Sequence, residues 1–362
     1  MPNAQPDQSL HLPSLVIKNF RGIDELTIPR LGRVTLLAGK NGVGKTTVLD
    51  AVRVWAGRGR LQVLEDVLSQ RGDTLNTIDR QGEQNTVIDW YALFTDRRSS
   101  TEIEVLIGSS STTDTLRIGW QSGVRLQSDE PVKIEPDDFV KGAKPALVAR
   151  VGNSTIYPSN TVNGSSPPPA VPFNVLGPDG PSDAMVERFW SEVALTSHED
   201  QALDALNLIT DAQVERVAAL GTPTGNGITQ PRRMTAKVQG KDYQVPLRTL
   251  GDGALRTYAV ALALAKSTNG FLLIDEAENG IHHTIQPKFW KMVLQTAERN
   301  NVQVLATTHS WDCVKGFAQA ANELEEVEGL LVRIERVPIG LRAITYDESR
   351  LDSIVKYGIE AR

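Results

Sequence analysis

The sequence has very little cysteine and no long apolar run. Its 362 residues include one cysteine, Cys313, which cannot form an internal disulfide and excludes a metal cluster built on cysteines. Cys313 is expected to be a small buried residue. No apolar run approaches the roughly 18 residues of a transmembrane helix, so no membrane partner is expected. Residues 1–15 lack the basic and apolar regions of a secretory signal, and a cytoplasmic protein fits these absences.

Basic residues are also fewer than acidic ones. The chain carries 38 Lys and Arg against 44 Asp and Glu, which gives a net charge of −6 at pH 7. Nucleic-acid binding needs clustered basic side chains that contact phosphates, so the charge does not indicate a nucleic-acid partner. A local basic face is not excluded, because the N-terminal part carries Lys18, Arg21, Arg30 and Arg33.

What is present is an alternation of short apolar strands and helical segments, which predicts an α/β core. Helices are expected over residues 47–56, 254–266 and 284–299. Strands are expected over residues 15–20, 33–37, 86–94, 102–107, 115–120, 271–274, 302–306, 330–334 and 341–346. Polar turns separate the strands between 86 and 120, which suggests an antiparallel β lobe beside the core.

The middle of the chain has a different composition. Residues 127–181 contain the runs NGSSPPPAVP and GPDGP, which predict an insertion or a long surface excursion. Residues 182–220 show apolar spacings of one, three and four and are expected to form two short helices. A hairpin is expected over residues 233–247, with its turn at 240–242.

A glycine-rich motif follows the second expected strand. Residues 39–46 read GKNGVGKT and match G-x4-G-K-[ST], a loop whose backbone N–H groups surround phosphates. Lys45 is expected to reach the β- and γ-phosphates, and the Thr46 hydroxyl to bind Mg²⁺. The sequence therefore predicts ATP and Mg²⁺ as cofactors, with nucleotide-binding residues Gly39, Lys40, Asn41, Gly42, Val43, Gly44, Lys45, Thr46 and Thr47.

Two later apolar strands end in polar residues. After FLLI, Asp275 is expected to hold Mg²⁺ directly or through water, and Glu276 to polarise the attacking water as general base. After VLATT, His309 is expected to contact the γ-phosphate and sense its loss. Acidic residues or a histidine at a strand end can also have a purely structural role. The predicted catalytic residues are Lys45, Glu276 and His309.

A glycine-bounded turn, LGDG at residues 250–253, precedes the buried helix expected over 254–266. Such a turn at a helix N-terminus can bind an anion. It can equally be an N-cap with Asp252 as the capping carboxylate. The pattern fits both interpretations.

Taken in order, LVIKNFRGI, GKNGVGKTT, LGDGALR, LLIDEAENGIH and TTHS resemble the motifs of ABC-type ATPases. They most resemble the branch with RecF, the SMC proteins and the overcoming-lysogenization-defect (OLD) ATPases. The resemblance implies an α/β fold, an ABC-ATPase-like P-loop core with an antiparallel β lobe and an inserted loop plus short helical segment. The implied parts are the N-terminal core over 12–126, the insertion over 127–229 and the C-terminal core over 230–362.

The resemblance further implies a composite site in a homodimer or higher homo-oligomer. Gly251, Asp252 and Gly253 would act in trans on the nucleotide of the other protomer. His309 would be the switch histidine, and residues 278–282 would form the D-loop at the interface. Family signature turns usually carry serine where this chain has Gly251, and the Q-loop glutamine is not identified, with residues 93–96 as its expected region.

The favoured function is that of an OLD-like ATPase without the long SMC coiled coil or a C-terminal TOPRIM nuclease. ATP-driven dimerisation would control a separate effector, such as a nuclease or toxin of a bacterial defence module. A low-turnover, nucleotide-gated scaffold and a RecF-type DNA-repair ATPase are the alternatives. The excess of acidic over basic residues disfavours the DNA-repair ATPase, and a transporter subunit fits least well.

Overall fold

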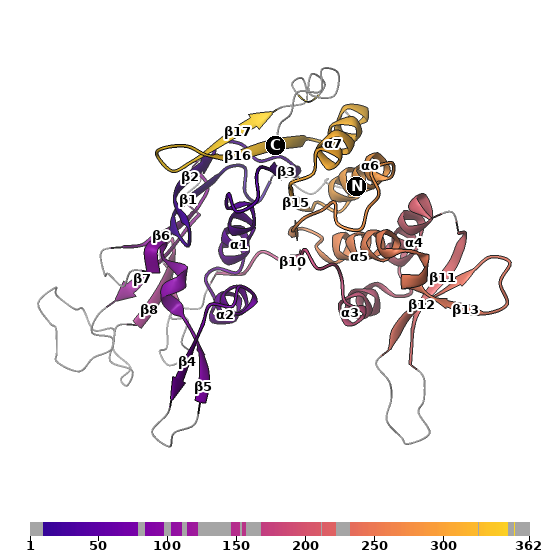
Figure 1. Cartoon of the computed structure of the whole chain (residues 1–362), viewed down its shortest axis with the longest axis horizontal. Coiled ribbons are helices and arrows are strands. Elements are labelled where there is room, and N and C mark those ends of the chain that lie inside the picture. The colour runs from indigo at the N-terminus through magenta and orange to yellow at the C-terminus, as the bar shows by residue number, and fades with distance from the viewer. Residues whose placement is uncertain are drawn as a thin grey trace, which may run out of the picture.

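The computed structural model describes residues 10–78, 84–97, 103–110, 114–121, 146–152, 154–156, 168–210, 212–221, 232–324, 326–346 and 351. Two six-stranded sheets carry the described fold, together with one three-stranded and one two-stranded sheet. Figure 1 shows the N-terminal elements on the left and the elements over residues 183–266 on the right, while the strands over residues 329–346 lie at the top beside the N-terminal elements.

The core sheet positions the motif loops. Its strand order is β10 (Phe173–Leu176), β14 (Phe271–Ile274), β15 (Gln303–Thr308), β3 (Val34–Ala38), β16 (Gly329–Arg336) and β17 (Leu341–Tyr346). Every neighbouring pair is parallel except the antiparallel pair of β16 and β17. Because the carboxyl ends of parallel strands meet at one edge, the loops that follow β3, β14 and β15 gather there.

The core sheet separates two hydrophobic cores. Leu36 of β3 packs on one face and Leu37 on the other, as the alternation of side chains along a strand requires. One core includes α3 (Asp183–Val193), α4 (Ser197–Ile209), α5 (Asp252–Lys266), α6 (Gln286–Arg299) and α7 (Trp311–Glu323). The other includes α1 (Lys45–Ala56), α2 (Leu61–Gln70) and the β lobe.

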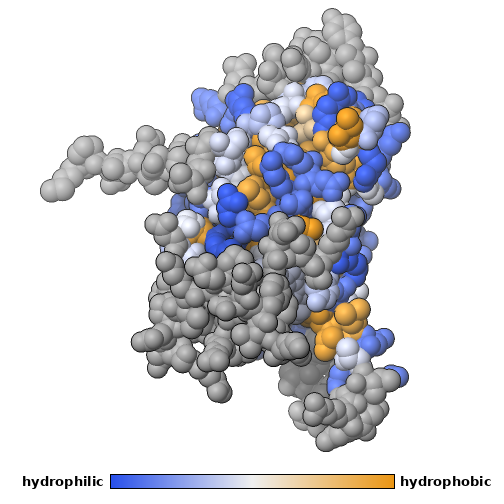
Figure 2. Space-filling model, turned by 90° about the vertical axis from the view of Figure 1, so that its left-hand side faces the viewer, coloured by the Kyte–Doolittle hydropathy of each residue, from blue (hydrophilic) through white to orange (hydrophobic). Residues whose placement is uncertain are grey.

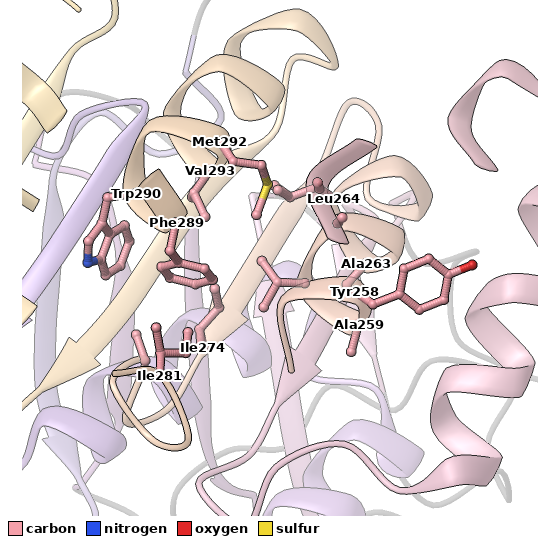
Figure 3. Close-up of a cluster of buried hydrophobic side chains, with 14 of the residues drawn as sticks. Tyr258, Ala259, Ala263, Leu264, Ile274, Ile281, Phe289, Trp290, Met292 and Val293 are labelled. Atoms are coloured by element: carbon pink, nitrogen blue, oxygen red, sulfur yellow. The ribbon is translucent and has the colours of Figure 1, made fainter. Parts of the chain in front are cut away.

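Helices α5 and α6 pack against each other over the sheet. Figure 3 shows Tyr258, Ala259, Ala263 and Leu264 of α5 in one cluster with α6 residues such as Phe289. Helix α5 is buried along nearly its whole length, as its apolar sequence predicts. It is therefore a rigid support for the turn that precedes it.

The N-terminal lobe is an antiparallel sheet, as expected. Its order is β2 (Ile23–Ile28), β1 (Leu15–Phe20), β6 (Val105–Gly108), β7 (Thr115–Gln121), β8 (Ala146–Val151) and β9 (Ser154–Ile156). All neighbouring pairs in it are antiparallel. On the side of the molecule that carries this lobe, hydrophilic and hydrophobic residues are interspersed over the coloured surface (Figure 2).

Two smaller sheets complete the described structure. Strands β4 (Thr74–Ile78) and β5 (Gln84–Ile88) form a hairpin below α2 in Figure 1. Strands β11 (Val214–Leu220), β12 (Arg233–Val238) and β13 (Gln244–Pro246) form an antiparallel sheet beside α3 and α4. The hairpin predicted over residues 233–247 is confirmed by the pairing of β12 with β13.

The expectation of an excursion over residues 127–181 is wrong for three described strands. Strand β8 pairs with β7 in the lobe and carries β9, while β10 pairs in parallel with β14 as an edge strand of the core sheet. Proline residues can flank an edge strand, because the N–H that proline lacks is not needed for a hydrogen bond to a neighbouring strand there. Residues 122–145 and 157–167 lie outside the described residues, and the division at 127 and 229 stays a prediction.

Two further expectations are wrong. The segment 214–220 is strand β11 rather than helix, because α4 ends at Ile209 and the following chain pairs with β12. The strand expected over 86–94 ends at Ile88. A 3₁₀ turn over Trp90–Leu93 follows it, and the Asp89 side chain accepts a hydrogen bond from the N–H of Tyr91 at the start of this turn.

Candidate active site

The predicted phosphate loop lies between β3 and α1. Its Gly39, Gly42 and Gly44 have φ of +151°, +71° and +107°, a region that side chains disfavour. At Gly39 a Cβ atom would lie 2.4 Å from the carbonyl oxygen of Ile334 in β16. The tight turn therefore requires glycine, and α1 begins directly after it, at Lys45.

Lys45 is buried inside this loop. Its Nζ donates hydrogen bonds to the carbonyl oxygens of Gly39 at 2.7 Å and Lys40 at 3.0 Å. Burial lowers the pKa of Lys45, while the carboxylates of Glu278, Asp275 and Glu276 oppose that shift. The loop thus holds a cation at the positive N-terminus of α1, where the phosphates of a nucleotide are expected.

The two predicted metal ligands are in contact. The Thr46 hydroxyl donates to Asp275 Oδ1 at 3.1 Å, and Thr307 Oγ1 donates to the same oxygen at 2.6 Å. A hydroxyl and a carboxylate oxygen at one point are the oxygen donors that Mg²⁺ prefers. These residues fit the ion, and their role as ligands stays a prediction.

Glu276 has an unusual backbone. Its φ is +50°, in the left-handed region, and its N–H donates to Thr307 Oγ1 at 2.8 Å. Asn279 donates to Glu276 Oε2 at 2.7 Å and also to the carbonyl oxygen of Pro178 at 3.1 Å. The Glu276 carboxylate is thus oriented while its side chain stays 37% exposed.

His309 lies beside these acids. Its ring Nδ1 is 3.1 Å from Glu278 Oε1 and 3.9 Å from Glu276 Oε1. The backbone N–H of His309 also donates to Glu278 Oε1, at 2.9 Å. The structure therefore brings His309 together with Glu276, while its contact with a γ-phosphate stays a prediction.

The signature turn occupies a different environment. Gly251 has φ +104° and ψ 154° and is the N-cap residue of α5, so Asp252 is the first helical residue and not the capping carboxylate. The Asp252 side chain is 77% exposed. A Cβ atom on Gly253 would lie 2.6 Å from the carbonyl oxygen of Gly280, so the turn packs against the segment 278–282.

Four residues outside the predicted catalytic, nucleotide-binding and metal-binding sets contribute to the site. Thr307 and Asn279 hold Glu276, as described above. The buried Arg256 of α5 donates from Nη2 to the carbonyl oxygens of Asp275 and Glu276, at 2.9 and 2.7 Å. These three residues belong to sequence runs that the motifs already include.

Arg71 is the fourth, and no motif marked it. Its guanidinium donates to both carboxylate oxygens of Asp50, at 2.9 and 3.1 Å, and lies 4.0 Å from Asp275 Oδ2. Burial raises the pKa of Asp50, and the paired guanidinium opposes that shift. Arg71 therefore links α1 to the carboxylate that follows β14.

A cavity adjoins the outer side of the phosphate loop. It has a volume of about 410 Å³ and is lined by Lys40 to Val43 and by Arg333 to Arg336. The expected Q-loop region, residues 93–96, contacts the turn between β1 and β2. The carbonyl oxygen of Leu93 accepts a hydrogen bond from the Arg21 N–H, and the Thr95 hydroxyl donates to the carbonyl oxygen of Ile23. The Q-loop role of this region stays a prediction.

A phosphate loop after one parallel strand and an acidic pair after a second, with a histidine after a third, define a P-loop nucleoside triphosphatase of the ABC type. The antiparallel lobe beside the core sheet agrees with that class.

Comparisons with known proteins agree. Residues 14–127 match the family described as "AAA domain", and residues 169–312 match "AAA domain, putative AbiEii toxin, Type IV TA system". An ATP/GTP phosphatase of Helicobacter pylori is 21% identical over 350 residues, which cover 86% of this chain and 89% of that protein. An uncharacterized protein of Methanocaldococcus jannaschii is 33% identical over 87 residues, 24% of this chain and 75% of that protein.

The fold is similar to that of an SMC head solved with the C-terminal winged-helix domain of ScpA. The TM-score is 0.51 at 10% identity, over 95% of this chain and 100% of that one. The chain is therefore a P-loop ATPase with two segments that match AAA-domain families, and the likeness to the SMC head concerns the fold. Within the described residues no helix is both long and apolar enough to cross a membrane.

Proposed function

We propose that this ATPase hydrolyses ATP with Mg²⁺ at a site shared by two copies, and that ATP-driven dimerisation controls a separate effector protein. One observation carries the proposal: the phosphate loop and acidic pair lie together in one chain, while the signature turn is exposed. Asp252 of that turn is 77% exposed, and Gly253 contacts Gly280. An exposed turn of this kind is available to bind a second copy of the chain.

The roles follow from the contacts described above. Lys45 binds the β- and γ-phosphates, and Thr46 with Asp275 holds Mg²⁺. When bound, Mg²⁺ neutralises charge on the phosphates. Glu276 accepts a proton from the attacking water, with Asn279 orienting its carboxylate. His309 contacts the γ-phosphate from the next strand of the sheet.

Gly251, Asp252 and Gly253 complete the site of the other copy. The N-terminus of α5 carries backbone N–H groups without a side-chain cap, and a γ-phosphate is the anion they would bind. Since Gly251 has no hydroxyl, this contact is made by the backbone. ATP closes the dimer and hydrolysis opens it.

Control of a separate protein has independent support. The similar SMC head was solved bound to a domain of ScpA, and the family that matches residues 169–312 is described as "AAA domain, putative AbiEii toxin, Type IV TA system", which names a toxin–antitoxin system but not the partner. The FRG turn and residues 278–282 favour the OLD-like group. An effector nuclease or toxin of a bacterial defence module in the cytoplasm is therefore the proposed partner class.

Mixing two inactive variants tests the shared site. Lys45→Ala removes the phosphate contact of one protomer, and Asp252→Trp blocks the exposed signature turn of the other. Each protein alone is expected to lose most of its turnover. A one-to-one mixture regains activity, because its heterodimer holds one intact phosphate loop opposite one intact signature turn. Phosphate release and light scattering with ATP are the measurements.

Asp200→Trp is the matched control, since Asp200 is an exposed acid in the first turn of α4. It is expected to retain wild-type turnover. Full turnover by Asp252→Trp alone, in a protein that stays monomeric with ATP, would show that each chain works independently. The shared site would then be wrong.

A further inference from the structure

Glu278 is a buried carboxylate between the acidic pair and His309. Its side chain is 10% exposed. A single oxygen, Oε1, accepts the backbone N–H of His309 at 2.9 Å and lies 3.1 Å from the ring Nδ1 of the same residue. One carboxylate oxygen therefore contacts both the backbone and the ring of His309.

An ionised carboxylate accepts hydrogen bonds and donates none. The 3.1 Å approach of Glu278 Oε1 to the ring is therefore attractive when Nδ1 of His309 carries the proton. The second contact of the same oxygen, with the backbone N–H of His309, holds the carboxylate beside the ring. Nε2 is the ring atom left for the nucleotide and the attacking water.

We propose that Glu278 is a positioning residue of the ATPase reaction, which fixes the orientation and the Nδ1 protonation of His309. The residue acts through His309 and does not itself touch the nucleotide. The inference rests on the proposed function only in assuming that His309 acts on ATP. Its structural part, the state of the His309 ring, is independent of dimerisation.

Folding alone does not explain Glu278. Its second oxygen, Oε2, is buried and has no hydrogen-bond partner among the described residues. Burying such an oxygen costs free energy, and a stabilising role would call for a fully satisfied carboxylate. Burial lowers the pKa values of both Lys45 and Arg256, and the charge of Glu278 opposes each shift. Glu278 thus lies among groups of the site.

The ring of His309 can be read directly by NMR of protein with ¹⁵N-labelled histidine, with His309→Ala assigning the signal. In the wild-type protein Nδ1 of His309 is expected to be protonated. In Glu278→Ala the neutral ring is expected to shift to the Nε2–H form, which free histidine favours. Glu278→Gln keeps an acceptor oxygen at the same place and is expected to retain Nδ1 protonation in part. The control is Glu326→Ala, which removes an exposed acid.

Kinetics test the link to the reaction. Glu278→Ala is expected to lower kcat roughly 10–100-fold, as for other residues that orient a functional histidine, with KM for ATP changed less than about twofold. The double variant Glu278→Ala, His309→Ala is expected to be no slower than His309→Ala alone, because both changes remove one function. Glu278→Gln, which preserves shape, gives the same comparison if the alanine variant unfolds.

Unchanged Nδ1 protonation in both Glu278 variants would overturn the proposal. So would an equal loss of kcat on removing Glu278 with or without His309. If the ring shifts as expected but the mixed variants above regain no activity, the shared site alone is wrong. If the mixture regains activity and the ring does not shift, only the role of Glu278 is wrong.

Discussion

Asp275 and Asp252 are both acids of ATPase motifs, yet their surroundings differ. The Asp275 side chain is 7% exposed, accepts two side-chain hydroxyl hydrogen bonds and lies near Arg71. The Asp252 side chain is 77% exposed, and its ion pair with Arg248, at 3.7 Å, lies on the surface. Exposed pairs of this kind contribute little to stability.

This difference shows which part of the site is assembled within a single chain and which part is not. Around Asp275, strands β3, β14 and β15 bring the side chains together before a nucleotide arrives. Around Asp252, helix α5 supplies a rigid base and Gly253 packs against Gly280, while the Asp252 side chain stays exposed. Substitutions in the first region are therefore expected to remove function outright, and those in the second to act through assembly or backbone strain.

The largest effect is expected for Lys45→Ala. Removing a buried charge that faces phosphates costs about 2–5 kcal/mol of binding, roughly 30- to 4,000-fold in Kd, so nucleotide binding is expected to be lost at ordinary ATP concentrations. Titration calorimetry with ATP is the measurement. Lys288→Ala is the control, because Lys288 is an exposed lysine of α6, outside the predicted site. Normal affinity in Lys45→Ala would contradict the site assignment.

Glu276→Gln is next. Loss of a general base is expected to lower kcat roughly 10²–10⁴-fold, with ATP affinity and ATP-driven dimerisation retained. Steady-state phosphate release and light scattering measure the two. If the wild-type protein turns over no faster than the variant while ATP still drives dimerisation, the protein is a nucleotide-gated scaffold.

Thr307→Val probes the support of the acidic pair. It removes the hydroxyl that donates to Asp275 and accepts from Glu276 N–H, and leaves both buried groups short of a partner. A loss of about 1–3 kcal/mol in stability is expected, with turnover reduced. Thr307→Ser keeps the hydroxyl and is expected to stay near wild type in thermal unfolding. Equal melting of the two variants would show that the methyl group matters instead.

Gly251→Ser gives the smallest expected effect and sharpens the contrast. It restores the serine usual in related signature turns, but the φ of +104° and ψ of 154° at this position disfavour any side chain. A stability loss of about 1–3 kcal/mol and no gain in kcat are expected. A faster and equally stable variant would indicate that the turn changes its backbone in the assembled state.

Much of the core could be predicted because its strands are short apolar runs that end in motif residues. Strands β3, β14 and β15 are of this kind, and their shared edge follows from parallel pairing. Strand β10 could not be placed, because a Pro-flanked run of four residues acquires strand structure only from its partner β14. Strand β11 was mistaken for helix because Val214 and Val217, three residues apart, match the helical period. Both are buried in the strand because its register shifts between Val214 and Arg216.

The site divides in the same way. Lys45, Thr46 and Asp275 carry their chemistry in the motif itself, so their proximity was predictable. The Glu276–Thr307 hydrogen bond depends on the register of β14 against β15, and the Arg71–Asp50 pair joins α1 to the chain after α2. Contacts that depend on three-dimensional register leave no pattern in the sequence.

The place of β3 has a consequence for synthesis. Val34–Ala38 lies between Gln303–Thr308 and Gly329–Arg336 in the core sheet, so both of its neighbours are translated long after it. Strands β1 and β2 can pair early on the ribosome, but β3 must wait with its apolar side chains unpaired. Contacts this distant in sequence slow folding and expose the nascent chain to aggregation. Refolding of the full chain is therefore expected to be slow and to give a higher yield at low protein concentration.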